Sequence, residues 1–343
     1  MSGYNIEYMK EIGSEFCEQY REIHTENKKN ELCLLSGRTA LQFIIDDICR
    51  KRFVRKVLLP SYCCESMILP FINQGIEVQF YQANNDWMDY PYDNDADVVF
   101  LIDFFGYINP QNGKIAYHEK HAKKIIIYDS THKIDGNLEV LNYADYSFCS
   151  YRKWFYCNFT LAVKYNGEFE NSENLMINER YISLRDEAAY DKRNYLSGLT
   201  NNKERFLSEF NKAEQLLEDD YIGYAGVPVS FDCNDIISKR RENALYLTDE
   251  LKNISEIKLW RNNIQVNDTP MFVPIVVNPL IRDTLRQELI SKKIYCPVHW
   301  PKTSYHTDCN KLYDMELSLV CDQRYDIADM ERMIRVIKGY FNG

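Results

Sequence analysis

The sequence predicts an α/β protein in which helices cover a mostly parallel sheet. After a polar lead-in that reaches about residue 30, short apolar runs alternate with longer amphipathic runs along the chain. This alternation is typical of repeated βα units. The run Val98–Ile102 is apolar at every position, as expected of a central strand that is covered on both faces.

The first unit is predicted to span residues 1–230 as the larger domain. Its predicted strands are Val57–Leu59, Glu77–Tyr81, Val98–Asp103, Ile125–Asp129, Tyr146–Cys149 and Leu161–Lys164. Helical patterns lie between several of these runs. From about residue 173 to residue 220 the pattern is helical and highly charged, which indicates two long surface helices.

The second unit, residues 231–343, is predicted to be a small C-terminal α+β domain. It opens with one amphipathic helix, Asp235–Leu251. The later strands and helices are expected at Ile257–Trp260, Met271–Val277, Arg282–Ser291, Leu317–Cys321 and Ile327–Phe341. A chain of 343 residues is long enough for such a pair of domains.

Composition and charge exclude several classes of partner. A formal net charge of −10 argues against nucleic acid or an anionic membrane as the main partner. The chain has no apolar run long enough to span a bilayer and no signal peptide at its start, so we expect a cytoplasmic protein. The 11 cysteines are scattered without a zinc-ligand spacing, which predicts thiols in a reducing compartment and no metal site.

The chemistry-bearing residues follow two of the predicted strands. Asp129 ends one strand, and Ser150 and Lys153 follow the next. Pyridoxal phosphate needs an amine to condense with its aldehyde and a carboxylate to keep its pyridine nitrogen protonated. Lys153 and Asp129 are candidates for these two roles, and the Ser150 hydroxyl is a candidate contact for the cofactor phosphate.

A second candidate phosphate contact precedes the first predicted helix. Gly37 provides a turn, and Arg38 and Thr39 open the helix that ends near Arg52. A helix N-terminus presents free N–H groups and a partial positive charge, so it binds phosphate without a basic cluster. An ordinary serine or threonine cap is the alternative interpretation of this segment.

His132 lies three residues after Asp129 and is expected to stack on the cofactor ring or to bond near its phenolic oxygen. Both residues also have a simpler interpretation. A lone aspartate at a strand end is often a helix cap, and a lone histidine is often a satisfied core residue. Their pairing at one strand end favours a functional role.

Taken together, these motifs resemble the DegT/DnrJ/EryC1 sugar aminotransferases, a branch of the fold type I pyridoxal phosphate enzymes. The matching segments are Glu11–Phe16, Ser36–Leu41, Leu59–Cys64, Asp129–His132, Ser150–Lys153, Ile294–His299 and Leu317–Leu319. The resemblance implies an aminotransferase that holds pyridoxal phosphate on Lys153. It also implies glutamate as the amino donor and a keto or aldehyde sugar, free or nucleotide-linked, as the acceptor.

The resemblance assigns further roles. Tyr62 is expected to stack on the cofactor ring, and Tyr295 and His299 are expected to contact the substrate. Arg193 and Asn194 belong to a segment that would reach the neighbouring phosphate site of a homodimer.

The sequence departs from the family pattern after the lysine and in the phosphate turn. Cys157–Thr160 stands where a glycine pair is usual, so Phe159 and Thr160 are expected to fill space beside the site. Arg38 stands where the family usually has a threonine. Two alternatives therefore stay open, a sugar dehydratase and a non-catalytic protein that binds the cofactor or a sugar. The dehydratases have histidine in place of the lysine, and Lys153 argues against them.

Overall fold

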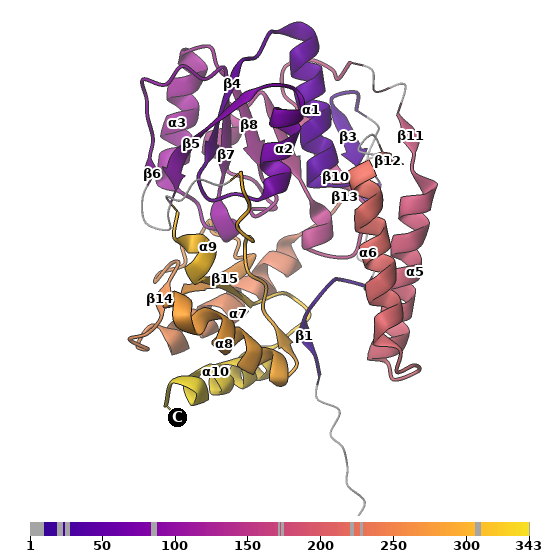
Figure 1. The fold of residues 1–343 in the computed structure, drawn as a ribbon, viewed down its shortest axis with the longest axis vertical. Helices are drawn as coiled ribbons and strands as arrows, with labels where there is room; N and C mark the ends of the chain where they lie inside the picture. The colour runs from indigo at the N-terminus through magenta and orange to yellow at the C-terminus, as the bar shows by residue number, and fades with distance from the viewer. Residues whose placement is uncertain are drawn as a thin grey trace, which may run out of the picture.

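A computed structural model describes residues 10–18, 23–24, 28–83, 88–170, 172, 175–219, 223–226, 229–305 and 310–342. Within these residues the chain forms a large α/β part and a smaller α+β part, which lie one above the other in Figure 1. No helix in the described ranges is both long and apolar enough to cross a membrane.

The large part is built on one sheet with the strand order β11-β12-β3-β10-β9-β8-β7-β4-β5-β6. Five neighbouring strands are parallel, namely β9 (Tyr146–Cys149), β8 (Ile125–Asp129), β7 (Val98–Ile102), β4 (Lys56–Pro60) and β5 (Glu77–Ala83). The antiparallel β10 (Thr160–Lys164) separates this group from β3 (Glu31–Leu34). The edges carry β6 (Met88–Asp89), β11 (Met176–Ile177) and β12 (Gly223–Gly226). The six predicted strands are thus present, whereas the sequence did not predict β3.

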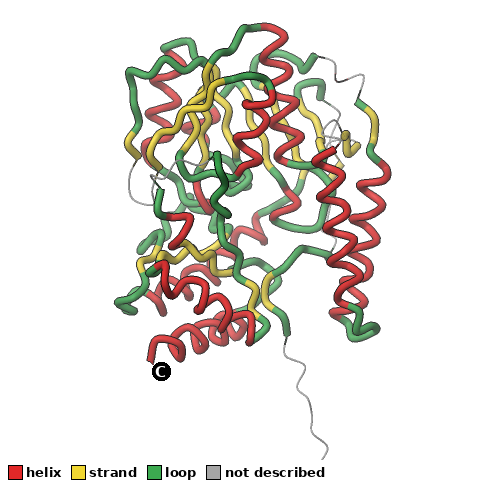
Figure 2. Tube along the Cα trace, in the orientation of Figure 1, coloured by secondary structure: helices red, strands yellow, loops and turns green. Residues whose placement is uncertain are grey.

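Helices flank this sheet, as Figure 2 shows. They are α1 (Gly37–Lys51), α2 (Glu65–Asn73), α3 (Pro110–His121) and the short α4 (Leu138–Leu141). The predicted pair of long charged helices is α5 (Glu179–Leu196) and α6 (Lys203–Asp219), which run side by side along one flank of the molecule (Figure 1). All five residues of β7 are buried, which explains why this strand is apolar on both faces.

The smaller part has its own apolar core. Its antiparallel sheet has the order β14 (Lys258–Leu259), β15 (Phe272–Val276) and β17 (Glu316–Val320). The helices packed around it are α7 (Asn234–Leu251), α8 (Pro279–Ser291), α9 (Leu312–Met315) and α10 (Ile327–Asn342). The predicted helix and strand positions of this region agree with these elements to within a few residues.

The lead-in does not belong wholly to the large part. Its strand β1 (Ile12–Gly13) pairs in parallel with β16 (Ile294–Tyr295), and Ile12 is fully buried in the core of the smaller part. The boundary after residue 230 coincides with the end of β13 (Val229–Ser230), which pairs with β2 (Ile23–His24). The domain prediction placed the whole lead-in with residues 1–230, whereas β1 packs on the smaller part.

Candidate active site

The carboxyl ends of neighbouring parallel strands bring the predicted site residues together. Asp129 ends β8, while β9 is followed by Ser150 and by the single turn η2 (Tyr151–Lys153). The side chains of Asp129, Ser150 and Lys153 line a cavity of about 110 Å³, which we call the inner cavity. Its other walls include Ser36, Gly37, Arg38, Cys64, Thr131, His132 and Arg152. Ligands of such sheets collect at this edge.

The start of α1 forms one end of the inner cavity through Gly37 and Arg38. The structure corrects the predicted role of Thr39 as a contact for the cofactor phosphate. Its backbone N–H donates to the Ser36 hydroxyl at 3.2 Å, and its own hydroxyl donates to the Ser36 carbonyl at 2.9 Å. The fully buried Thr39 side chain is thus used in a capping box and does not line the cavity.

Asp129 and Lys153 are two ionisable groups of this cavity that interact electrostatically. Burial raises the pKa of Asp129, while its hydrogen bonds with Thr131 and the charge of Lys153 oppose the rise. One carboxylate oxygen accepts the Thr131 backbone N–H at 2.8 Å, so the side chain is held in a fixed orientation. Lys153 is half-buried, and it lines this cavity and the larger one described below.

His132 is held as one tautomer. Its Nδ1 accepts the Phe105 backbone N–H at 3.0 Å, so the ring proton lies on Nε2. That Nε2 is buried and has no hydrogen-bond partner among the described residues. Burial, together with the charge of Lys153, lowers the pKa of His132 well below its usual value, so the ring is neutral. The ring lies parallel to that of Trp300, with 5.6 Å between centroids.

Ser150 is buried and lines the inner cavity. Its hydroxyl accepts a hydrogen bond from Thr160 at 3.0 Å, which leaves its own proton free to be donated. Thr160 therefore supports the site and does not fill it. Phe159 packs in a separate cluster with Phe155 and Phe231, and neither Phe159 nor Thr160 lines a described cavity. The expected filling of the site by these residues is corrected.

Tyr62 is also placed differently from the sequence expectation. Its fully buried ring packs against Phe104, Trp300 and Tyr313, with centroid distances of 5.0 to 5.8 Å. It does not line the inner cavity, and Cys64 does. The aromatic cluster offers the large apolar ring more contact than the polar cavity would, so we withdraw the stacking role of Tyr62.

Lys153 also borders a second cavity of about 540 Å³, the outer cavity. The predicted substrate residues Tyr295 and His299 both line it. Its charged walls comprise Glu15, Arg152, Lys153, Lys203, Arg240, Arg286, Asp322 and Arg324. Because Arg152 and Lys153 line both cavities, the lysine lies where the inner and outer cavities meet.

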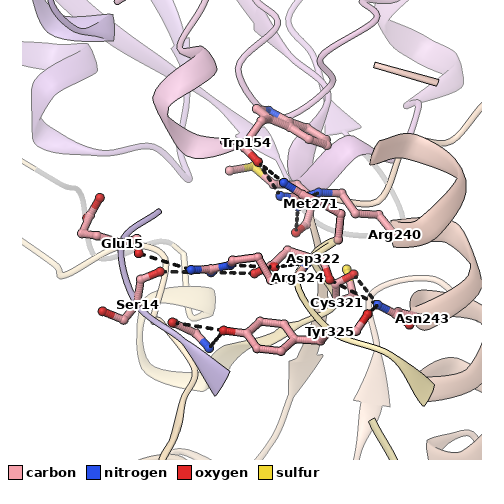
Figure 3. Close-up of polar contacts among 12 residues, drawn as sticks. Ser14, Glu15, Trp154, Arg240, Asn243, Met271, Cys321, Asp322, Arg324 and Tyr325 are labelled. Carbon is pink, nitrogen blue, oxygen red and sulfur yellow. Dashed lines mark hydrogen bonds and ion pairs between the residues drawn. The ribbon is translucent and has the colours of Figure 1, made fainter. Parts of the chain in front are cut away.

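The buried Arg240 and the half-buried Arg324 hold the walls of the outer cavity in place (Figure 3). Arg240, from α7, donates to the Met271 carbonyl at 2.8 Å and lies over the Trp154 ring at 4.3 Å. Arg324 donates to the carbonyls of Ser14 and Glu15 at 3.1 and 3.2 Å. These bonds fix part of the lead-in as one wall of the cavity.

The residues predicted to act across subunits lie outside both cavities. Arg193 donates to the Cys17 carbonyl of its own chain. Asn194 lines a different cavity, of about 370 Å³, together with Tyr190, Asp191 and Arg205. These contacts neither need nor exclude a second subunit.

The sequence interpretation missed Arg152 and Arg286. Arg152 forms a two-pronged ion pair with Glu214, at 2.8 and 3.4 Å, but beside Lys153 it had the pattern of a solvated basic pair. Arg286, on α8, donates its Nε to the Cys296 carbonyl at 3.0 Å and lines the outer cavity. Nothing in the local sequence distinguishes it from an arginine on a surface helix.

No family model matches this sequence, and no curated protein does. Solved structures of similar fold are found. PseC of Helicobacter pylori, an aminotransferase involved in the biosynthesis of pseudoaminic acid, has a TM-score of 0.65 at 14% identity, over 97% of this chain and 100% of that one. The PMP-form of the putative sugar aminotransferase Spr1654 from Streptococcus pneumoniae has a TM-score of 0.63 at 13% identity, over 96% and 97%.

A DegT DnrJ EryC1 StrS aminotransferase from Brucella abortus has a TM-score of 0.58 at 15% identity, over 90% of this chain and 85% of that one. In each case the similarity covers both the sheet and the smaller part of the chain. The fold of this chain is therefore the fold type I architecture of these aminotransferases.

Proposed function

We propose that this protein is a pyridoxal phosphate-dependent aminotransferase. The observation that carries the proposal is the position of Lys153 at the junction of two cavities, one lined by Asp129 and the start of α1 and the other by the smaller part. Solved structures of the same fold include the PLP-form and the PMP-form of Spr1654. The two bound forms named for Spr1654 support pyridoxal phosphate chemistry for this chain.

The inner cavity fits the cofactor. The buried Nε2–H of His132, which has no partner in the part of the chain that the structure describes, is suited to donate to the phenolic oxygen of the ring. The Ser150 hydroxyl and the first N–H groups of α1 are suited to the phosphate. Asp129, once ionised, would hold a proton on the pyridine nitrogen.

When bound, pyridoxal phosphate supplies an electron sink for the bond that breaks at the substrate carbon. The Nζ atom of Lys153 would hold the cofactor aldehyde and then move the proton at that carbon. Its position at the junction gives it access to both cavities. The walls contributed by the lead-in and the smaller part would limit the access of water to this proton.

The outer cavity fits an anionic substrate. The chain has a net charge of −10, but the described residues that line this cavity include five cationic side chains besides Lys153 and two carboxylates, Glu15 and Asp322. Asp322 is already paired with Arg324 at 2.8 Å. We therefore propose glutamate as the amino donor and a keto or aldehyde sugar, free or nucleotide-linked, as the acceptor. The solved structures described as sugar aminotransferases support the sugar.

A spectrum tests this function. The purified protein, mixed with pyridoxal phosphate, should give a visible absorption band that bleaches when L-glutamate is added. Borohydride reduction followed by peptide mapping should find the cofactor on Lys153, and Lys153→Ala should lose the band. A band that glutamate leaves unchanged would favour a non-catalytic binding protein, and an adduct on another lysine would disprove the role of Lys153.

We also propose a homodimer in which each site is completed by its partner. Large exposed apolar side chains gather around the α5–α6 pair, at Met176, Ile177, Tyr190, Leu196, Leu199 and Leu207. Leu207 and Lys203 of α6 also line the outer cavity, so a second copy seated on this surface would border the site. Exposed apolar side chains along this helix pair support an interaction surface there.

Mixing two inactive variants tests shared sites. If Arg193 acts on the partner's site, Lys153→Ala mixed with Arg193→Ala regenerates one intact site per mixed dimer. If Arg193 acts only through its own Cys17 carbonyl, the mixture stays inactive. A monomer by light scattering would disprove the dimer itself.

A further inference from the structure

A chain of buried hydrogen bonds ends in the outer cavity. Ser318, on β17, lies between a carboxylate and an imidazole. Its hydroxyl is 2.5 Å from Oε1 of Glu316 and 2.9 Å from Nδ1 of His299. Glu316 and Ser318 are fully buried, and His299 is 9% exposed and lines the cavity. Since Nδ1 is engaged, Nε2 is the ring nitrogen left for the cavity.

The surroundings of Glu316 decide where it can carry a proton. Oε2 lies 2.7 Å from the His299 backbone N–H and 3.4 Å from the Tyr62 hydroxyl, and both groups donate to it. A proton on Oε2 would face the peptide N–H, which cannot accept it, and could reach only the more distant Tyr62 hydroxyl. Oε1, at 2.5 Å from the Ser318 hydroxyl, is therefore the favoured oxygen for the proton of a protonated Glu316.

Both protonation states of Glu316 are accessible near neutral pH. Burial raises the pKa of Glu316 to about 8, opposed by its bonds with Ser318, His299 and Tyr62 and by the charge of Arg282. Besides these groups, the buried Cys296 thiol interacts with the carboxylate. Burial and the charge of Lys153 lower the pKa of His299 to about 3, so its ring stays neutral.

We propose that Glu316, Ser318 and His299 form a buried proton relay that ends at Nε2 of His299, beside Lys153 in the outer cavity. Glu316 and Ser318 are positioning residues in this relay, because they act on the cavity only through His299. The use of the relay in amino transfer rests on the proposed function, whereas the relay itself is a property of the protein without cofactor.

The relay moves one proton without creating a cation. With Glu316 ionised, Ser318 donates to Oε1, Nδ1 of His299 donates to Ser318, and Nε2 has a free electron pair. When Nε2 takes a proton from a group in the cavity, the Nδ1 proton passes to Ser318 and the Ser318 proton passes to Oε1. The imidazole ends neutral with its proton on Nε2, and the carboxylate ends as the acid.

The two states give His299 opposite roles in the cavity. With Glu316 ionised, Nε2 accepts a hydrogen bond or a proton, and with Glu316 protonated it donates one. An imidazolium at this position would be opposed by burial and by Lys153. The relay thus provides acid and base chemistry at one nitrogen without that charged state.

Nitrogen-15 NMR of the histidine-labelled protein, without cofactor, tests the relay. The signal of His299 is identified by its loss in His299→Gln. In the wild type, its proton should lie on Nε2 at pH 6.5 and on Nδ1 at pH 9.5, with the change centred near the Glu316 pKa of about 8. A single tautomer throughout this range, or an imidazolium signal at pH 6.5, would overturn the proposal.

Two variants separate the relay from mere packing. In Glu316→Gln the amide oxygen must accept the His299 N–H, so the amide nitrogen faces Ser318 and locks the proton of His299 on Nε2 at every pH. Ser318→Ala breaks the connection and should make the tautomer independent of Glu316. Glu119→Gln changes another fully buried carboxylate, bonded to Tyr90 and paired with Lys124, and should leave His299 as in the wild type.

Turnover gives a second measurement. The rate of amino transfer should depend on pH near 8 in the wild type and Glu119→Gln, and this dependence should disappear in Glu316→Gln. If no variant transfers an amino group but the tautomers change as described, the proposed function fails and the relay stands. If Glu316→Gln keeps the wild-type tautomer change, the relay fails whatever the activity.

Discussion

Thr131 joins the ends of two neighbouring strands, because its hydroxyl oxygen accepts the Ser150 backbone N–H at 3.1 Å. The carbonyl of Thr131 also accepts the indole N–H of Trp154 at 2.7 Å. Thr131, two residues after Asp129, thus binds the Lys153 segment at Ser150, before the lysine, and at Trp154, after it. Together with the bonds from Ser130 to the Phe148 carbonyl, Thr131 fixes the relative position of the segments that contain Asp129 and Lys153.

Thr131→Val should destabilise the protein by about 1 to 3 kcal/mol. The substitution keeps the shape of the side chain but leaves the buried Ser150 N–H without an acceptor. Urea unfolding at neutral pH measures the change in the free energy of unfolding. Thr131→Ser keeps the hydroxyl and serves as the control, and equal stability of the two variants would show that this bond contributes nothing.

Asp129→Ala should retain the fold but lose most of the amino transfer. If Asp129 pairs with a protonated pyridine nitrogen, removing it costs about 3 to 5 kcal/mol, as for other buried charge pairs. Single-turnover kinetics with glutamate measures the loss. If the rate falls by less than about tenfold, or roughly 1.4 kcal/mol, the role of Asp129 would be structural, as the acceptor of the Thr131 backbone N–H.

Arg286→Gln should raise the KM for an anionic substrate by about tenfold or more, with a smaller effect on kcat. A charge-assisted hydrogen bond from an arginine contributes about 1.5 to 3 kcal/mol. Arg335→Gln, on the exposed surface of α10, makes the same change in net charge and should leave KM unchanged. Equal effects of the two variants would mean that only the overall charge matters.

Glu316 should make folding stability decrease as pH rises. Below its ordinary pKa of 4.5 the group is protonated in the folded and unfolded states alike. Between 4.5 and its folded pKa of about 8 only the folded state holds the proton, so the stability of the wild type relative to Glu316→Gln should fall by on the order of 4 kcal/mol. Above pH 8 the difference should be constant. Urea unfolding of both proteins from pH 5 to 9 measures it, and a constant difference would contradict the raised pKa.

The sequence predicts those features that depend on local pattern. Apolar runs such as that of β7 reveal the strands, and strand ends identify Asp129, Ser150 and Lys153. The roles of Tyr62 and Thr39 could not be decided in this way, because an aromatic cluster or a capping box satisfies these side chains through contacts with distant or backbone groups. Glu316 shows the same limit, since its five-residue strand gives no sign that one carboxylate is buried between Tyr62 and His299.

The pairing of β1 with β16 sets an order for biosynthesis. Ile12 leaves the ribosome well before its partner Ile294, which is made 282 residues later. The inner cavity needs only residues between Ser36 and Leu217, so it can form while translation continues. The outer cavity cannot close until the segment around Tyr295 has emerged. A nascent chain would therefore possess the inner cavity before it possesses the enclosed outer cavity, and an interrupted chain would expose Lys153 to solvent.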